Sequence, residues 1–490
     1  MPPIDPREGT RRAPGRSARD TSGMCPVLRI PLSLLLCVAM WPLAAAALDL
    51  PERPGDFWLR MDALPLPVAG PTDAVHEARF ASLAELTEQA LRSRPESRAA
   101  WLAIQAEAAR LDAAGAANWP TLTGQLALTR SRALSSSGAT APTLDRFAPS
   151  LSLAYVLYDF GARAAGIDAQ RYQLIASLLS GNRVLQDTIA EVEAAYFARV
   201  AAAAQVAAWA EQETALQASL DAVEARLSSG LASRADQLRA RAALIEAQLE
   251  RQGAERDLAK ADAALKQAAG LAQAAPLTLA WEAVPPPALD ASVLLADLLA
   301  EAQRQRPDLL ALQAAAASAR AEADRARAAR WPSLALAANT GRTFFIDDDR
   351  NPSTSYSVGV NLSVPLFDGG RLAAQARAAE RDAERLAAEA DAQRGQVARA
   401  VAEAWHDVRH AQARRAGVTV QFDSARESAQ AADARYRAGV GSVLELLTAQ
   451  ADLARARQVQ AQADADWLAA FSRLNHALGR LPAATPQGQP

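Results

Sequence analysis

The sequence predicts a mainly α-helical fold that carries a small transmembrane β portion. Three observations support this fold class: two very long stretches with helical periodicity, four short segments in which apolar and polar residues alternate, and the same order of elements in both halves of the chain. Half of the 490 residues are hydrophobic, and Ala, Glu, Arg, Gln and Leu dominate the composition. Such a composition is typical of long helices and coiled coils.

The two halves of the chain are related by a duplication. The pairs Arg94-Pro and Trp119-Pro recur at one common offset as Arg306-Pro and Trp331-Pro. Internal repeats of this kind indicate that one structural unit occurs twice. The predicted organisation is a signal peptide, an extended segment, a first repeat, a Pro-rich linker, a second repeat and a disordered tail, over residues 1–47, 48–75, 76–273, 274–290, 291–480 and 481–490.

The N-terminal segment is interpreted as a signal peptide that is removed after Ala47. A basic residue precedes an apolar run that ends in small residues, and the run is too short for a spanning helix of about 20 residues. Met24 is an alternative start. Both cysteines, Cys25 and Cys37, lie in this segment, so the mature chain is expected to lack thiol and disulfide chemistry. Lipidation of Cys37 stays open.

Each repeat is expected to contain three helices. The first ends at the Trp-Pro pair, because Pro cannot continue a helix and restricts the residue before it. The second is very long and would span roughly 100 Å at 1.5 Å per residue. A Gly-containing break separates it from the third. The predicted ranges are 96–117 and 307–330 for the first helix, 161–227 and 370–436 for the second, and 233–269 and 442–478 for the third.

Between the first and second helix of each repeat lie two predicted strands. Apolar residues alternate with small polar residues, a pattern typical of transmembrane barrels, and each segment has about the length that crosses a bilayer. An open sheet edge has no hydrogen-bond partners in lipid, and four strands are too few to close a barrel. Two chains would give a plugged tube of eight strands, whereas three would give twelve strands and a lumen. The predicted strands cover residues 122–130, 151–158, 333–340 and 355–366.

The switch from strand to long helix occurs at two short junctions, which we expect to mark the passage from membrane to periplasm. Glycines there would allow backbone turns that other residues resist. Val156 occupies the repeat position of Pro365, so the first junction lacks a proline. The predicted junction residues are Asp159, Gly161, Pro365, Asp368, Gly369 and Gly370.

Catalytic, cofactor and metal sites are not expected. The sequence contains no Gly-rich phosphate loop, nucleophile elbow or carboxylate pair, and a net charge of −3 offers no basic surface to nucleic acid. His406 and His410 stand four residues apart on a predicted helix, a spacing that can bind zinc. No third ligand is near them in sequence, and the first repeat has Phe197 and Ala201 there. We therefore favour a packed or solvated pair.

The duplicated Arg-Pro and Trp-Pro pairs, the stretch "PLFDGG" and the stretch "YRAGVGSVLELLTAQADL" resemble the TolC family of outer-membrane efflux proteins. The resemblance implies a homotrimer with a twelve-stranded β-barrel in outer-membrane lipid and a long α-barrel in the periplasm. It implies a passive export duct of a tripartite efflux or type I secretion system, without enzymatic activity. Its partners would be a periplasmic adaptor (membrane fusion protein) and an inner-membrane pump of the RND or ABC type.

The resemblance also implies a periplasmic gate near the Gly-containing breaks. By position, Asp236 and Glu445 match acidic residues at the family's entrance, and Tyr436 matches a gate tyrosine. In a trimer each acid would form a ring that selects cations. Two positions depart from the family: Thr448 replaces a second Asp of some members, and Gly441 replaces a gate Arg. These departures leave open how the gate opens.

Two other functions were weighed. A periplasmic adaptor would have one helical hairpin flanked by lipoyl-like β segments, and a coiled-coil structural protein would need neither a signal peptide nor strands. The duplicated unit with four strands favours the export duct over both. The exported cargo, whether drug, metal, peptide or protein, is left open, as is the family of the pump.

Overall fold

The computed structural model describes residues 78–80, 82–132, 143–279, 294–346 and 351–480. The predicted signal peptide, the extended segment and the C-terminal tail lie outside these residues. None of the described helices is both long enough and apolar enough to cross a membrane.

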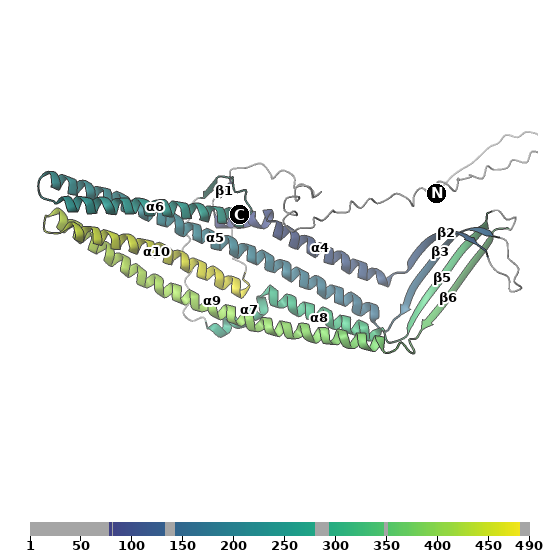
Figure 1. The fold of residues 1–490 in the computed structure, drawn as a ribbon. Helices are drawn as coiled ribbons and strands as arrows, with labels where there is room; N and C mark the ends of the chain where they lie inside the picture. The colour runs from purple at the N-terminus through teal and green to yellow at the C-terminus, as the bar shows by residue number, and fades with distance from the viewer. Residues whose placement is uncertain (1–77, 81, 133–142, 280–293, 347–350, 481–490) are drawn as a thin grey trace, which may run out of the picture. The chain divides into compact units, whose positions relative to one another are not determined.

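Both halves of the chain contain the same series of elements, which confirms the duplicated unit (Figure 1). The first half comprises α3 (Leu83–Ser93), α4 (Pro95–Gly115), the 3-10 turn η2 (Ala116–Asn118), β2 (Thr121–Ser131), β3 (Leu144–Tyr158), α5 (Ala162–Ser228) and α6 (Arg234–Ala268). The second comprises α7 (Leu295–Gln305), α8 (Pro307–Ala328), β5 (Ser333–Phe345), β6 (Ser353–Ser363), α9 (Arg371–Arg437) and α10 (Val443–Leu478).

The long helices α5 and α9 are the main supports of the fold. Each has 67 residues, and their bounds agree with the predicted ranges to within one residue. Along α5 lie α4 and α6, and along α9 lie α8 and α10, while α8 and α10 also pack against α5 (Figure 1). Just over half of the buried hydrophobic residues are alanines. Small side chains allow the helix axes to approach closely, so the rods pack without a large apolar core.

Short elements that the sequence analysis did not predict precede each helix series. Helix α3 begins at its N-cap Ser82, whose Oγ accepts from the backbone N–H of Glu85 at 3.3 Å. Helix α7 occupies the same place in the second repeat. The three-residue strands β1 (Ala78–Phe80) and β4 (Leu277–Leu279) pair in parallel, and thus join the start of the first repeat to the segment predicted as a linker.

The four longer strands form one antiparallel sheet with the order β2-β3-β5-β6. Strands β2 and β6 are its edges, and neither has a second strand partner among the described residues. The predictions were wrong at three ends. Strand β3 begins at Leu144 rather than at residue 151, β5 ends at Phe345 rather than at residue 340, and β6 ends at Ser363 rather than at residue 366. Pro365 follows, and its lack of an N–H explains why pairing stops there.

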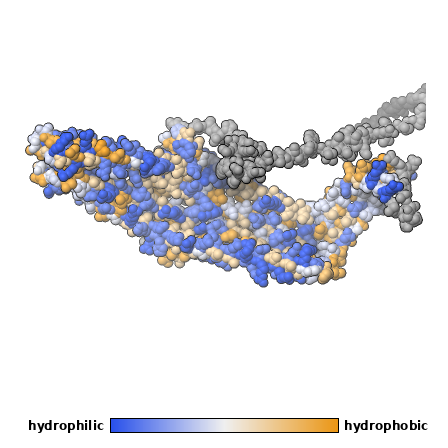
Figure 2. Space-filling view, in the orientation of Figure 1, coloured by the Kyte–Doolittle hydropathy of each residue, from blue (hydrophilic) through white to orange (hydrophobic). Residues whose placement is uncertain are grey.

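The two faces of the sheet differ in polarity. One face carries Leu122, Leu126 and Leu128 at the β2 edge and Val358 and Val360 at the β6 edge, all strongly exposed in the single chain. The pairing register places serines, threonines and glycines on the other face. In Figure 2 hydrophobic residues gather over the strands and at the end of the sheet where the helices begin. Such a sheet suits lipid on one side and water on the other.

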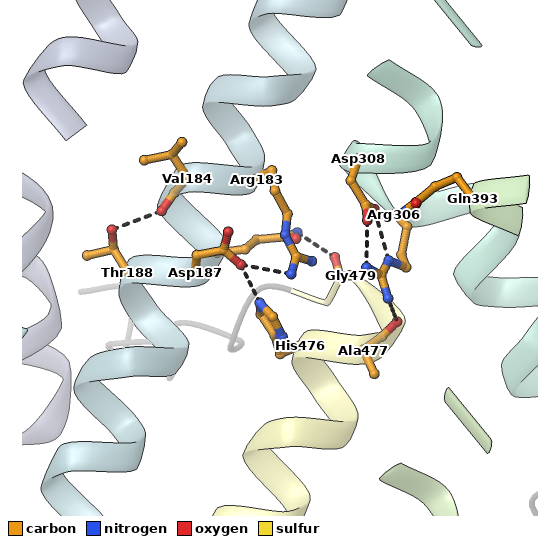
Figure 3. A network of polar contacts seen from close by, with 11 residues as sticks. Arg183, Val184, Asp187, Thr188, Arg306, Asp308, Gln393, His476, Ala477 and Gly479 are labelled. Atoms are coloured by element: carbon orange, nitrogen blue, oxygen red, sulfur yellow. Dashed lines mark hydrogen bonds and ion pairs between the residues drawn. The ribbon is translucent and has the colours of Figure 1, made fainter. Parts of the chain in front are cut away.

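The arginine of the Arg-Pro pair at the start of α8 is buried. Arg306 is 7% exposed and joins three helices (Figure 3). Its guanidinium donates to both carboxylate oxygens of Asp308, at 2.9 and 2.6 Å, and to the carbonyl oxygen of Ala477 at 3.3 Å. Gln393 of α9 donates to the same Asp308 at 2.9 Å. The end of α10 is thereby tied to α8 and α9.

The other side of α10 is tied to α5 through a histidine. The Nε2 atom of His476 lies 2.6 Å from Oδ1 of Asp187, which also accepts from Arg183 at 2.8 Å (Figure 3). Burial lowers the pKa of His476, and its contact with Asp187 offsets this only in part. The charges of Arg183 and Arg306 lower the pKa further. The folded protein therefore favours the neutral imidazole.

This lowered pKa predicts a pH-dependent stability. As the pH falls below the ordinary value of 6.5, the unfolded state takes up a proton before folded His476 does. The contribution of His476 is thus complete above that value and is lost as the pH falls toward the folded pKa. We expect the Tm of the detergent-solubilised protein to fall more steeply between about pH 7 and pH 5 than that of His476→Gln. The exposed His406→Gln is the control, and equal slopes for wild type and His476→Gln would contradict the prediction.

Candidate functional site

The helix turns farthest from the sheet hold all three residues predicted for the gate. One turn joins α5 to α6 and the other joins α9 to α10. Beneath them, residues of all four helices form one buried cluster, which comprises Leu216, Leu220, Val223, Ala240, Leu244, Ala247, Tyr436, Val443 and Leu446. We call these two turns and this cluster the tip.

Asp236 lies in the first turn of α6, where it completes a capping box. Its backbone N–H donates to Oγ of Ser233 at 3.1 Å, while its carboxylate accepts from the hydroxyl and the N–H of Ser233 at 2.7 and 3.2 Å. The hydrogen bond from the Ser233 hydroxyl is the main cause that lowers the pKa of Asp236. Arg239 adds a weak ion pair at 3.4 Å. This acid therefore stabilises the helix end, whatever else it does.

Glu445 occupies the equivalent turn of α10 but uses its carboxylate differently. Its backbone N–H donates to Oγ of the N-cap Ser442 at 3.1 Å, as in the first repeat. Its side chain instead pairs with Arg435, with Nε 3.2 Å from Oε1. Both side chains of this pair are largely exposed. Glu445 is thus held near the turn while its carboxylate stays open to solvent.

Tyr436 lies in the last turn of α9 and is 4% exposed. The guanidinium of Arg226, from the last turn of α5, stacks over its ring at 4.1 Å from Cζ to the ring centroid. The same guanidinium donates to the carbonyl oxygens of Tyr436 and Arg437, at 2.6 and 3.2 Å. Arg226 therefore caps the C-terminus of α9 and ties the first helical hairpin to the second. Among the described residues, the Tyr436 hydroxyl has no hydrogen-bond partner.

Arg226 was missed by the sequence analysis, although a signal was present. The repeats align "EARLSSG" with "DARYRAG", which pairs Arg226 with Arg435. The two arginines have different partners: Arg226 contacts Tyr436 of the other hairpin, whereas Arg435 pairs with Glu445 of its own hairpin. No described hydrogen bond or ion pair joins Asp236, Glu445 and Tyr436 to one another. The structure brings the three residues to one end of the helices without direct contact.

The two departures from the TolC pattern have different surroundings. Gly441 is enclosed, since a Cβ there would lie 3.0 Å from the backbone nitrogen of Tyr436 and 3.1 Å from the carbonyl carbon of Arg435. A larger residue would need the turn to shift. Thr448, one turn along α10 from Glu445, is exposed. The turn as it stands therefore has room for glycine at position 441 but not for an arginine.

The first predicted junction is a short turn between β3 and α5. Gly161 has φ 90°, and the preceding Phe160 is left-handed as well, with φ 52°. Asp159 holds the turn, because its Oδ2 accepts from the backbone N–H and from Nε of Arg163, both at 3.0 Å. The ring of Phe160 stacks on Trp331 at 5.6 Å, which joins the junction to the start of β5.

The second junction is longer, because β6 ends before Pro365 and α9 begins only at Arg371. Gly369 and Gly370 have φ 68° and 85°, where a side chain would be strained. Asp368 accepts from the N–H of Gly370 at 2.9 Å and of Leu372 at 2.8 Å, and so caps α9. Both junctions thus combine an aspartate with a left-handed glycine.

His406 and His410 are exposed on α9, and the ring of His406 contacts Trp405 edge-on. Among the residues that the structure describes, no group of three or more His, Cys, Asp or Glu side chains is arranged to hold a metal ion.

An amphipathic sheet with two open edges, continued by helices of 67 residues, is the arrangement of a subunit of a membrane channel. The comparisons with known proteins agree. The chain belongs to the outer membrane efflux protein family, which it matches over residues 86–271 and 298–480. It is an outer-membrane channel protein that extends into the periplasm. This excludes the adaptor and the coiled-coil structural protein.

Similar proteins cover most of the chain. Protein CyaE of Bordetella pertussis is 32% identical over 434 residues, which are 87% of this chain and 90% of CyaE. The pyoverdine export outer membrane protein OpmQ of Pseudomonas putida is 28% identical over 84% of this chain and 90% of its own length. The structure of the outer-membrane channel OprN has the same fold, with a TM-score of 0.72 and 22% identity over 84% of this chain and 98% of OprN.

The contacts of Arg226 predict how firmly the two hairpins are held together at the tip. Arg226→Gln removes the charge that caps α9 and stacks on Tyr436, and hydrogen bonds to charged groups are worth more than neutral ones. We expect amide hydrogen exchange over residues 430–440 to accelerate about tenfold, because local opening of this segment becomes easier. The matched control is Arg435→Gln, which breaks only an exposed ion pair and should change exchange much less. Equal effects of the two variants would contradict the assigned role.

Proposed function

We propose that three copies of this chain form a passive export duct through the outer membrane and the periplasm. The observation that carries the proposal is the pair of open edges on a sheet whose one face is apolar. Four strands cannot enclose water, and edges without partners are not tolerated in lipid. Three sheets joined edge to edge would give twelve strands, and the long helices would continue the wall. The duct itself would carry out no catalysis.

The direction and energy of export would come from partners. We propose a periplasmic adaptor and an inner-membrane pump of the RND or ABC type, because the family works with both in tripartite systems. The relative OpmQ is named for pyoverdine export and the relative AprF for secretion of alkaline protease, so these names support export as the function and leave the choice of cargo to the pump. The exposed helix faces near the tip are the natural surface for the adaptor.

For the tip we propose unequal roles for the two acids. Glu445 would supply the ring of charge at the periplasmic entrance, since its carboxylate is exposed and paired only with the exposed Arg435. Asp236 would contribute less, because its carboxylate is engaged by Ser233. Tyr436 would hold the second hairpin in the closed arrangement through its contacts with Arg226.

Cross-linking across the open edges tests the shared barrel. The mature chain is expected to lack cysteine, so every cross-link must form between the introduced cysteines. Thr123→Cys on β2 is combined in turn with cysteines at edge positions of the same face of β6, namely Ser355, Ser357 and Asn361. We expect at least one combination to give a covalent, heat-resistant trimer on gels. The control pair, Ser152 and Asn339, faces each other inside one sheet and should link only within a chain. Exclusively monomeric products, together with a monomeric mass in detergent, would contradict the proposal.

Conductance in planar bilayers tests the roles of the acids. A trivalent cation added from the tip side should block the wild-type channel, and Glu445→Gln should raise the blocking concentration about tenfold, since a ring of like charges is removed. Asp236→Asn should change block less, but should lower Tm because the capping box is lost. Unchanged block in both variants would remove the proposed entrance ring.

A further inference from the structure

The water-facing side of the sheet is almost free of charge. The register puts side chains from each of the four strands on this face, and nearly all are Ser, Thr, Asn, Gln, Gly or Ala. One row across the sheet illustrates the pattern. At this level the face carries Thr123, Ser152, Asn339 and Ser357. In the duct proposed above, on which this inference rests, this face lines the lumen.

One residue breaks the pattern. Arg146 is the single charged side chain that the described parts of the four strands place on this face. It is paired with Thr129 on β2 and with Phe345 on β5, near the end of the sheet remote from the helices. Its Cζ lies 5.9 Å from the centroid of the Phe345 ring, which confirms that both side chains share the face.

No carboxylate among the described residues forms an ion pair with Arg146. Its Nε is buried and lacks a hydrogen-bond acceptor among these residues, although guanidinium groups away from bulk water normally find one. The neighbouring acid, Asp145, belongs to the opposite face and pairs with Arg130 at 3.1 Å. The positive charge of Arg146 is therefore uncompensated by its described neighbours.

The apolar face offers an instructive contrast. Its arginines are engaged: Arg130 by Asp145, and Arg342 by the ring of Phe344, at 5.0 Å from Cζ to the ring centroid. Arg342 lies three residues before Phe345 on β5, roughly 10 Å along the strand from the level of Arg146. The two arginines thus lie in the same outer half of the sheet but on opposite faces.

We propose that the Arg146 side chains of three chains form a cationic ring near the extracellular end of the lumen, and that this ring binds the carboxylate or phosphate groups of anionic cargo. Rings of arginine or lysine side chains favour anions in pores. The polar but uncharged lining around Arg146 leaves nothing on the described strands to cancel its field. Anionic groups would therefore be concentrated at the mouth, at the opposite end of the duct from the acids of the tip.

The range of this field sets the conditions of the test. The Debye length is about 30 Å at 0.01 M salt but about 3 Å at 1 M, so a ring in a wide lumen acts strongly only in dilute salt. The reversal potential of single channels in a planar bilayer, measured under a salt gradient near 0.01 M, reports anion preference. Tripolyphosphate added from the barrel side probes the ring directly, because a polyvalent anion should enter and block.

Arg146→Gln should lower the ratio of anion to cation permeability about twofold in dilute salt and abolish block by tripolyphosphate from the barrel side, with both effects fading at about 1 M salt. Arg146→Lys should retain both properties. Arg342→Gln, the matched control from the lipid-facing side, should leave them unchanged. Block by trivalent cations from the tip side should be the same in all three variants.

The outcomes separate this inference from the duct itself. If the wild-type protein forms no channel, the proposed function fails. If it conducts but Arg146→Gln keeps the wild-type reversal potential and the tripolyphosphate block, the cationic ring is wrong and the duct stands. If Arg342→Gln changes selectivity as much as Arg146→Gln does, the assignment of the faces is overturned.

Discussion

The unpaired backbone of β2 and β6 is the constraint on which the rest of the structure depends. Each edge strand is 11 residues long, and along its outer side alternate N–H and C=O groups lack a partner within the described chain. At membrane depth every such group costs several kcal/mol, which water cannot relieve. The apolar face next to these edges requires lipid. A single chain cannot satisfy both demands, so the sheet is complete only when other copies supply its neighbours.

The long helices also need partners, which the other helices of the same chain supply. A helix of 67 residues cannot fold around a core of its own, and the structure supplies no single core. Buried residues are instead divided into separate clusters along the rods: one where α3 and α6 meet α5, one where α7, α8 and α10 meet α9, one at the tip, and a small one of alanines between α9 and α10. The contacts of Arg306 and His476 lie outside the cluster at the tip, so packing is distributed along the rods and is not concentrated in one place.

The features that sequence analysis predicted well are those with a long period or a strong local rule. Both long helices were predicted to within one residue, because no Pro interrupts their periodicity. Strand ends were predicted less well: β3 continues to Leu144 although Pro149 lies within it. The pairing of β3 with β5 skips Ala148 and Pro149, so the proline lies where that ladder is interrupted. The start of α3 could have been predicted from its N-cap residue Ser82. Strands β1 and β4 could not be predicted, because three residues carry no period and their pairing spans the whole first repeat.

The site was harder to predict for a physical reason. Position in the repeat located Asp236, Glu445 and Tyr436 at one end of the helices, but the partners of a side chain depend on which helix packs beside it. Arg226 contacts the other hairpin, and no local pattern encodes that contact. Caps are local, so the role of Ser233 could have been found from its spacing to Asp236 alone.

The duplication places equivalent residues in the two repeats, and at the tip these equivalent residues make different contacts. Arg226 and Arg435 are equivalent, yet one binds the end of the opposite hairpin while the other binds Glu445 in its own. Asp236 and Glu445 are equivalent, yet one is engaged by its capping serine and the other is open to solvent. The first repeat thus supplies both structural contacts, whereas the equivalent residues of the second repeat form an exposed ion pair. A duplicated subunit can therefore have a fixed hairpin and a chemically exposed one at the same entrance, which a strictly symmetric repeat would not provide.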